Sequence, residues 1–166
     1  MKEQITINSL EFAQESREIR GTISPHDLGR LEDVLFSKNG KLDYLLQGSV
    51  NAYGQPEIRL HLQGELILAC QRCMGPVRHA IDTSVRFVVV PDAGMLPAPE
   101  DDQDDVDYLV ADPRLDVVEL VEDEILLELP MAPLHEVAVC GVAAAGAEEQ
   151  KESPFKVLQG LKLGKS

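Results

Sequence analysis

The sequence predicts an α+β fold in which a mainly antiparallel sheet, a meander, packs with two principal helices. Three long runs between Lys41 and Val90 alternate apolar and polar residues with a period of two, as strands with one wet face do. Two other segments, from about Pro25 and from about Asp116, space their apolar residues as amphipathic helices do. At 166 residues, 44% of them hydrophobic, the chain is long enough for one domain with its own core.

The first 35 residues are predicted to form two strands and a helix. The stretches ITINSLEFA and REIRGTI have alternating or β-branched character, which favours two short strands joined by a polar connection. In SPHDLGRLEDVLF, Ser24 is suited to cap a helix and Pro25 to occupy its first position. Apolar residues then follow at helical spacing, namely Leu28, Leu31, Val34 and Leu35. We therefore expect an amphipathic helix from about Pro25.

The meander is predicted from KLDYLLQGSVNAY, PEIRLHLQGELILAC and VRHAIDTSVRFVVV. These runs are separated by the turn signals YGQP and MGPV. The alternation is clearest in IRLHLQGEL, where every second residue is apolar. Three antiparallel strands are expected, with the last hairpin turning near Gly75 and Pro76.

The stretch DPRLDVVELVEDEILLELP predicts an acidic helix that packs on the sheet and ends before Pro130. Its apolar stripe consists of Val117, Val118, Leu120, Val121, Ile125, Leu126 and Leu129. Residues 1–135 are then one α+β domain with an acidic loop at about 92–107. Residues 136–166 are expected to be a flexible tail, in which SPFKVLQGLKLGK is a candidate docking segment containing Phe155 and Lys156.

The net charge of −14 is concentrated in one segment. Between Asp92 and Glu128 there are 14 acidic residues and one basic residue, Arg114. The run PEDDQDDVDY is typical of a solvated loop, and the alternative is a docking surface for a basic protein. The candidate partner-binding carboxylates are those of Glu100, Asp101, Asp102, Asp104 and Asp105. Nucleic acid is disfavoured as a direct partner of this segment, because its phosphates would be repelled.

Any RNA contact is therefore expected elsewhere on the surface. The candidates are Arg59, Arg72, Arg78 and Arg86 in the meander, with Lys156, Lys162 and Lys165 near the end of the chain. Arg72 stands between two cysteines at the expected hairpin tip, and Arg78 follows shortly after it. The alternative is that these arginines are solvated residues of the sheet face.

Cys70 and Cys73 form a CxxC motif at that tip, a spacing used by zinc knuckles and by dithiol redox centres. No helical pattern follows Cys73 and no βαβ unit surrounds it, which disfavours redox catalysis. A zinc site needs further ligands, and His135 and Cys140 in PLHEVAVC can supply a nitrogen and a sulfur from a second loop. The alternative is that the thiols are simply buried. Zinc is a possible cofactor, and no other is indicated.

The sequence indicates a cytoplasmic protein without catalytic activity. No apolar run approaches the length of a membrane span, and MKEQITINSLEF lacks the basic start and apolar block of a signal peptide. There is no Walker loop, no GxGxxG after a strand, no HExxH and no recognisable nucleophile motif. The acidic run EDDQDD has no regular spacing of metal ligands, which disfavours a nuclease.

Several pieces occur in a distinctive order from about Gly64 onward: GELILACQRCMGPV, the acidic segment, DVVELVEDEILLELPMAPLHE and the terminal SPFKVLQGLK. In content and order they resemble the YceD family, the large ribosomal RNA subunit accumulation proteins. The resemblance implies a non-enzymatic bacterial protein needed for normal accumulation of large-subunit ribosomal RNA. It also implies a second CxxC after the acidic helix, as in many relatives. Here that place reads VAVC, with Val137 at the first thiol position, so four sulfurs are excluded within one chain.

Two functions remain open at this point. The first is a ribosome biogenesis factor that supports synthesis, processing or stability of large-subunit ribosomal RNA. Its partners would be the large-subunit precursor, through ribosomal RNA or a basic ribosomal protein, and not a membrane. The second is a zinc- or thiol-dependent module with a role unrelated to ribosomes. The two differ in their dependence on Cys70 and Cys73.

Overall fold

The computed structural model describes residues 5–97, 106–136 and 140. Within these residues the chain forms a six-stranded sheet, a two-stranded sheet, two α-helices and three short 3₁₀ turns. In chain order the elements are β1 (Thr6–Ile7), α1 (Ser9–Gln14), β2 (Glu18–Ile23), η1 (Pro25–Asp27), η2 (Gly29–Leu31), β3 (Leu35–Ser37), β4 (Leu42–Val50), β5 (Pro56–Ala69), β6 (Pro76–Val90), η3 (Ala93–Met95), β7 (Asp107–Val110), β8 (Leu115–Asp116) and α2 (Val117–Glu128).

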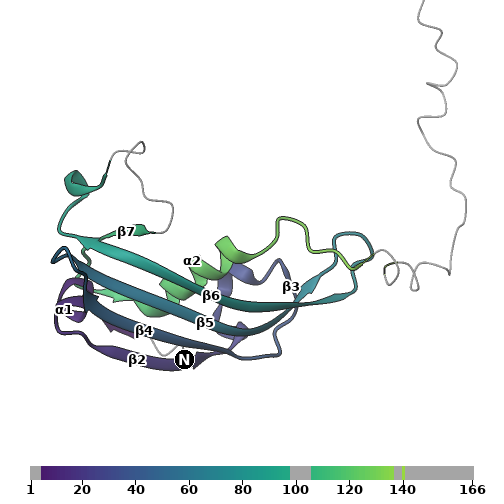
Figure 1. The fold of residues 1–166 in the computed structure, drawn as a ribbon. Coiled ribbons are helices and arrows are strands. Elements are labelled where there is room, and N and C mark those ends of the chain that lie inside the picture. The colour runs from purple at the N-terminus through teal and green to yellow at the C-terminus, as the bar shows by residue number, and fades with distance from the viewer. Residues whose placement is uncertain (1–4, 98–105, 137–139, 141–166) are drawn as a thin grey trace, which may run out of the picture.

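The predicted α+β class and the antiparallel meander are confirmed. The main sheet runs β2-β4-β5-β6-β7, with β3 pairing the remaining length of β5. All of these pairs are antiparallel except β6 with β7, which is parallel. The strands β5 and β6 are the longest, and they extend beyond β2 and β4 to a hairpin at one end of the molecule (Figure 1).

One face of the sheet, called here the inner face, carries the core. Every second residue of β5 points to this face, and apart from Gly64 those between positions 58 and 68 are fully buried, namely Ile58, Leu60, Leu62, Leu66 and Leu68. Each such side chain stabilises the fold by about 1.5–3 kcal/mol relative to an exposed one. Helices α1 and α2 contribute Phe12, Val117, Val121 and Ile125 to the same core. The opposite, outer face of the meander is partly exposed.

Helix α1 lies directly on the inner face because Gly48 of β4 has no side chain. A Cβ at Gly48 would lie 2.9 Å from Ala13 Cα and closer still to the carbonyl oxygen of Phe12. The backbones of the helix and the strand therefore approach more closely than any other residue would allow.

The predicted acidic helix is confirmed as α2. Asp116 caps its start, since the side-chain carboxylate accepts hydrogen bonds from Val118 N at 2.9 Å and Glu119 N at 3.3 Å. Leu129 ends the helix immediately before Pro130, which cannot continue it. No helix in the described part of the chain is long and apolar enough to cross a membrane.

The predicted helix from Pro25 is wrong. Ser24 caps the turn as expected, but the segment forms only η1 and η2 before it enters β3. Tertiary hydrogen bonds compete with helix continuation. Arg30 N donates to the Glu122 carboxylate at 2.6 Å, and the carbonyl of Val34 accepts from Ala69 N of β5 at 3.1 Å. Residues three apart share a face in 3₁₀ geometry, so Leu28 and Leu31 can both be buried without an α-helix.

The predicted strand ITINSLEFA is also only partly present. Thr6 and Ile7 form β1 with β8, after which the chain enters α1. The Asn8 side chain accepts a hydrogen bond from Glu11 N at 3.2 Å, which makes Asn8 the helix cap. This capping pattern was missed because the helix is only six residues long.

The domain boundaries and the flexible tail stay predictions. The acidic run with Glu100, Asp101, Asp102, Asp104 and Asp105 lies outside the described residues. The same holds for the terminal docking segment with Phe155, Lys156, Lys162 and Lys165. The segment around the acidic run is described on both sides, as η3 before it and β7 after it.

Candidate metal centre

The CxxC motif lies in the hairpin between β5 and β6, and we call residues 70–75 the hairpin tip. Cys70 N donates to Gly75 O, and Met74 N donates to Cys70 O, both at 2.9 Å. Met74 adopts a left-handed conformation with φ of 58°, which closes the turn. Cys70 is fully buried, and Cys73 is half-buried.

The loop that follows α2, here called the closing loop (residues 129–136), lies against the hairpin tip. Gln71 N donates a hydrogen bond to Pro133 O at 2.9 Å, and His135 Nε2 lies 2.8 Å from Pro76 O. These two contacts hold His135 beside the cysteines, although it is 62 residues further along the chain than Cys73. Cys140 comes to the same place from beyond the closing loop.

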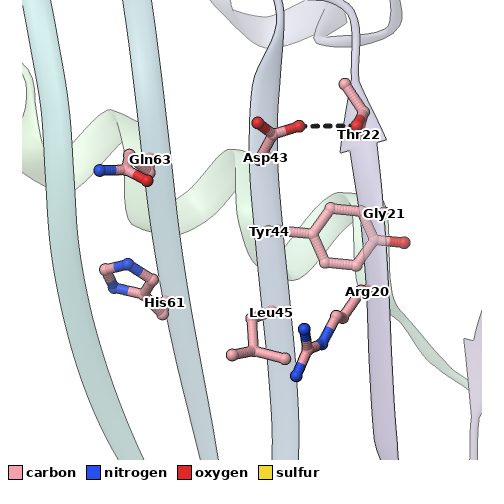
Figure 2. A pocket seen from close by; sticks show the side chains of 8 residues that line it. All are labelled: Arg20, Gly21, Thr22, Asp43, Tyr44, Leu45, His61 and Gln63. Carbon is pink, nitrogen blue, oxygen red and sulfur yellow. Dashed lines mark hydrogen bonds between the residues drawn. The ribbon is translucent and has the colours of Figure 1, made fainter.

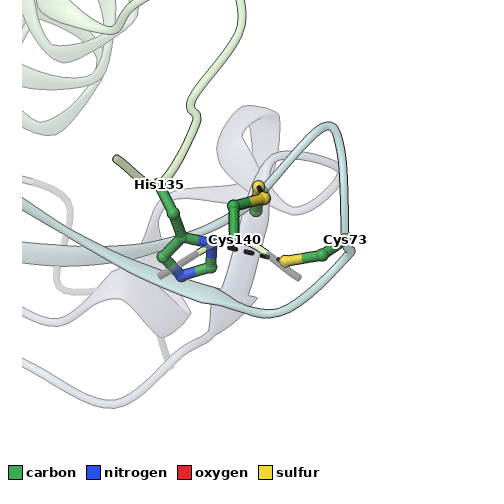
Figure 3. Close-up of side chains that lie close together, drawn as sticks. Cys73, His135 and Cys140 are labelled. Carbon is green, nitrogen blue, oxygen red and sulfur yellow. Dashed lines mark hydrogen bonds between the residues drawn. The ribbon is translucent and has the colours of Figure 1, made fainter. Parts of the chain in front are cut away.

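The structure brings together all four predicted metal ligands, Cys70, Cys73, His135 and Cys140. Their ligand atoms lie within 4.8 Å of one another. Cys73 Sγ lies 3.3 Å from His135 Nδ1 (Figure 3). Cys70 Sγ lies 3.8 Å from Cys140 Sγ. A tetrahedral zinc ion with Zn–S bonds of about 2.3 Å separates two sulfurs by about 3.8 Å. The group therefore has the donors and the size of a Cys3His zinc site.

The hydrogen bonds around the four ligands also suit a metal. When His135 Nε2 carries the proton and donates it to the carbonyl of Pro76, Nδ1 keeps its lone pair and faces the sulfurs. Arg72 N donates to Cys70 Sγ at 3.4 Å, an interaction that favours the thiolate form required of a ligand.

The pKa values of the Cys70 and Cys140 thiols are shifted in opposite directions. Burial alone would raise the pKa of Cys70, but hydrogen bonds with the backbone of Cys73, His135 and Arg72 outweigh it and lower that pKa from 9.0 to about 5. Burial raises the pKa of Cys140, and its hydrogen bonds with the sulfurs of Cys70 and Cys73 raise it further. The Cys70 thiol therefore loses its proton easily, whereas Cys140 would have to lose its proton on binding a metal ion.

The arginines expected on the sheet lie on its outer face. Arg59 and Arg86 are cross-strand partners, and Arg78 lies on the same face of β6. Arg59 approaches Glu57 at 3.7 Å, and Arg78 approaches Glu65 at 3.4 Å. Arg72 is exposed at the hairpin tip. Two of these four arginines, Arg59 and Arg78, therefore lie beside carboxylates, so this face is not a purely basic patch.

A shallow pocket of about 370 Å³ lies over β2, β4 and β5 (Figure 2). Arg20, Leu45 and His61 form one row across it, since they are paired in register. Thr22 donates to Asp43 at 2.6 Å, and His61 Nδ1 lies 3.1 Å from Thr83 O. Most polar groups that line the pocket already have hydrogen-bond partners within the sheet. The pocket is lined by both polar and apolar side chains, and no single sign of charge is concentrated there.

Comparison with known proteins adds the decisive observation. Residues 58–162 match the family described as large ribosomal RNA subunit accumulation protein YceD. The chain belongs to the YceD family. It is also similar to a protein of that name from Haemophilus influenzae, with 25% identity over 98% of this chain and 97% of the relative. No solved structure matches the chain.

The YceD match spans both halves of the candidate metal centre. Sequence reasoning selected the four side chains by their chemical type, but it missed two backbone groups that orient them. These are the carbonyl of Pro76, which fixes His135, and the N–H of Arg72, which contacts Cys70. A backbone group leaves no signal in the residue type, so only the folded geometry could identify either one.

Proposed function

We propose that the protein is a cytoplasmic ribosome biogenesis factor that supports synthesis, processing or stability of large-subunit ribosomal RNA without catalysing a reaction. Membership of the YceD family carries the proposal. The similarity to the Haemophilus influenzae protein over nearly the full length of both chains supports it. The factor would act by binding precursor RNA, a basic ribosomal protein, or both.

Two surfaces suit these two kinds of partner. The segment between Asp92 and Glu128 has 14 acidic residues against one basic residue, and two of these acidic residues, Glu122 and Glu124, are buried. The other carboxylates would attract the strongly basic ribosomal proteins. RNA phosphates are repelled there and would instead contact the outer-face arginines Arg59, Arg78 and Arg86 or the exposed Arg72. The proposal therefore assigns protein and RNA to different parts of the surface.

The test measures the ratio of large-subunit to small-subunit ribosomal RNA in cells that lack the protein. We expect the ratio to fall, and to be restored by the wild-type chain. Sedimentation of the tagged protein in cell extracts should place part of it with large-subunit precursors at low salt. An unchanged ratio together with no sedimentation beside precursors would reject the proposal.

A second comparison separates the two surfaces. Amide replacement of Glu100, Asp101, Asp102, Asp104 and Asp105 should weaken binding to a purified basic large-subunit protein, and the loss should shrink as salt rises. Replacement of Arg72 and Arg78 by glutamine should instead weaken binding to ribosomal RNA fragments. Unchanged protein binding after amide replacement would leave the acidic run with only a solubilising role.

We further propose that Cys70, Cys73, His135 and Cys140 hold a structural zinc ion. The ligand-atom spacing and the hydrogen bond between His135 and Pro76 support it. The ion would join the hairpin tip to the end of the closing loop, which are far apart in sequence. A closed set of four protein ligands leaves no open position for substrate or water, so the expected role is structural.

Metal analysis of the purified full chain should find about one zinc ion per chain. The alternative function, a zinc- or thiol-dependent module unrelated to ribosomes, is separated by a Cys73→Ser variant tested in cells. If the variant loses zinc but restores normal ribosomal RNA ratios, the metal centre serves something else. If it loses both, the centre supports the proposed ribosomal role.

A further inference from the structure

Three large apolar side chains are exposed along the end of α2 and the closing loop, and we call Leu127, Met131 and Leu134 the apolar stripe. Leu127 is 78% exposed, Met131 is fully exposed, and Leu134 is 46% exposed. They lie on the part of the chain that runs from α2 to the hairpin tip (Figure 1). The closing loop itself is held in place, because Pro133 and His135 bind the hairpin. The stripe is therefore presented on an anchored segment.

Carboxylates interrupt this stripe. Glu128 and Glu136 are exposed within the same stretch, and Glu119 is exposed on α2. Arg72 adds one positive charge at the hairpin tip. A partner that matches such a surface combines apolar side chains with positive charges.

The end of the chain has this composition. Residues 151–166 read KESPFKVLQGLKLGKS, in which four lysines accompany a single glutamate. The apolar residues of this stretch are Phe155, Val157, Leu158, Leu161 and Leu163. The charges are opposite to those around the apolar stripe, and the apolar residues offer contacts to it.

Chain continuity also favours this segment as the occupant. Cys140 lies beside Cys70 at the hairpin tip, so the chain leaves the described body next to the closing loop. Twelve residues, 141–152, then separate Cys140 from Ser153. In general, a chain of that length without regular structure spans about 20 Å on average and gives a tethered segment an effective concentration in the millimolar range.

We propose that the C-terminal segment, residues 153–163, docks on the apolar stripe of the same molecule. Phe155 and Leu158 would contact the stripe, and Lys156 and Lys162 would face the carboxylates of Glu128 and Glu136. The inference is independent of the ribosomal role and of zinc identity. If the intrinsic dissociation constant of the docking contact is about 0.1 mM, an effective concentration of about 1 mM leaves the stripe uncovered roughly one tenth of the time. Reagents that attack the stripe would then react about tenfold more slowly.

Methionine oxidation tests this in the unmodified full chain. Met131 is fully exposed in the described structure, whereas Met95 of η3 is 61% exposed and lies at the opposite end of the molecule (Figure 1). Without docking, dilute hydrogen peroxide should convert Met131 to the sulfoxide faster than Met95. With docking, the oxidation rate of Met131 should fall by up to about tenfold and drop below that of Met95, as measured on the two peptides by mass spectrometry.

Matched variants complete the test. Phe155→Asp with Leu158→Asp should restore fast oxidation of Met131 and leave the oxidation of Met95 unchanged, since the proposed docking does not involve η3. Protection should not depend on protein concentration. Rapid oxidation of Met131 in the wild type overturns the proposal. Protection that increases with protein concentration also overturns it, because a second copy of the chain would then be the occupant.

Discussion

His135 Nε2 lies 2.8 Å from the carbonyl oxygen of Pro76, so a residue after α2 is oriented by the first residue of β6. This contact turns His135 Nδ1 toward Cys73 Sγ, which is 3.3 Å away. Together with the hydrogen bond from Gln71 N to Pro133 O, this contact holds the closing loop against the hairpin, and it directs the fourth candidate ligand toward the three sulfurs.

We predict that His135→Ala lowers zinc affinity by at least about tenfold, since it removes a direct ligand and such losses exceed those of outer hydrogen-bond partners. Competition with a chromophoric chelator measures the affinity. His61→Ala is the matched control, because His61 lies on the outer face of β5, away from the cysteines. Equal losses in the two variants would contradict the assignment of His135.

Zinc removal is expected to loosen the hairpin tip before it affects the sheet. Chelation at neutral pH should accelerate hydrogen exchange at the amides of Cys70 and Gln71, whose hydrogen bonds close the tip and hold Pro133. The amide of Leu60 in central β5 should keep its protection. Uniform acceleration along β5 would instead mean that the metal stabilises the whole fold.

Glu124 predicts a pH dependence of stability. Burial, followed by the charges of Asp107 and Asp123, raises the pKa of its carboxyl from 4.5 to about 7. The folded state then binds more protons than the unfolded state between these values. Stability contributed by this group is therefore highest at low pH and falls as pH rises from about 4.5 to 7, by at most about 3 kcal/mol.

Replacement Glu124→Gln removes that titration. The variant should be more stable than the wild type at pH 8, and the difference should shrink at pH 5. Urea unfolding at both pH values gives the two free energies. Glu119→Gln, an exposed residue on the same helix, is the control and should show no such pH-dependent gain.

We predict that Gly48→Ala destabilises the fold by about 1–3 kcal/mol, because a methyl group there would collide with the backbone of α1. Ser49→Ala, at the adjacent position of β4, should change the free energy of unfolding much less. Thermal unfolding measures both. A neutral Gly48→Ala result would show that α1 can move away from the sheet without cost.

The sequence by itself determined the meander and the acidic helix, because both have strong local signals. The alternation of IRLHLQGEL follows from a strand with one buried face, and Asp116 and Pro130 bracket α2 with a cap and a stop. The position of Cys70 and Cys73 at a hairpin tip followed from the turn residues Gly75 and Pro76. The residue types of the four candidate ligands were likewise readable from the sequence.

Only the tertiary structure decided what happens where local and long-range interactions compete. The segment after Ser24 had helical spacing, yet the carboxylate of Glu122 and the edge of β5 bind its backbone and leave two 3₁₀ turns. The pairing of β7 with β6 is parallel, which no local pattern specifies. His135 and Cys140 reach the hairpin tip because α2 packs on the inner face, and the closing loop that follows α2 contacts the hairpin. Such contacts join residues that are distant in sequence, so no short stretch of the sequence can predict their contribution to stability.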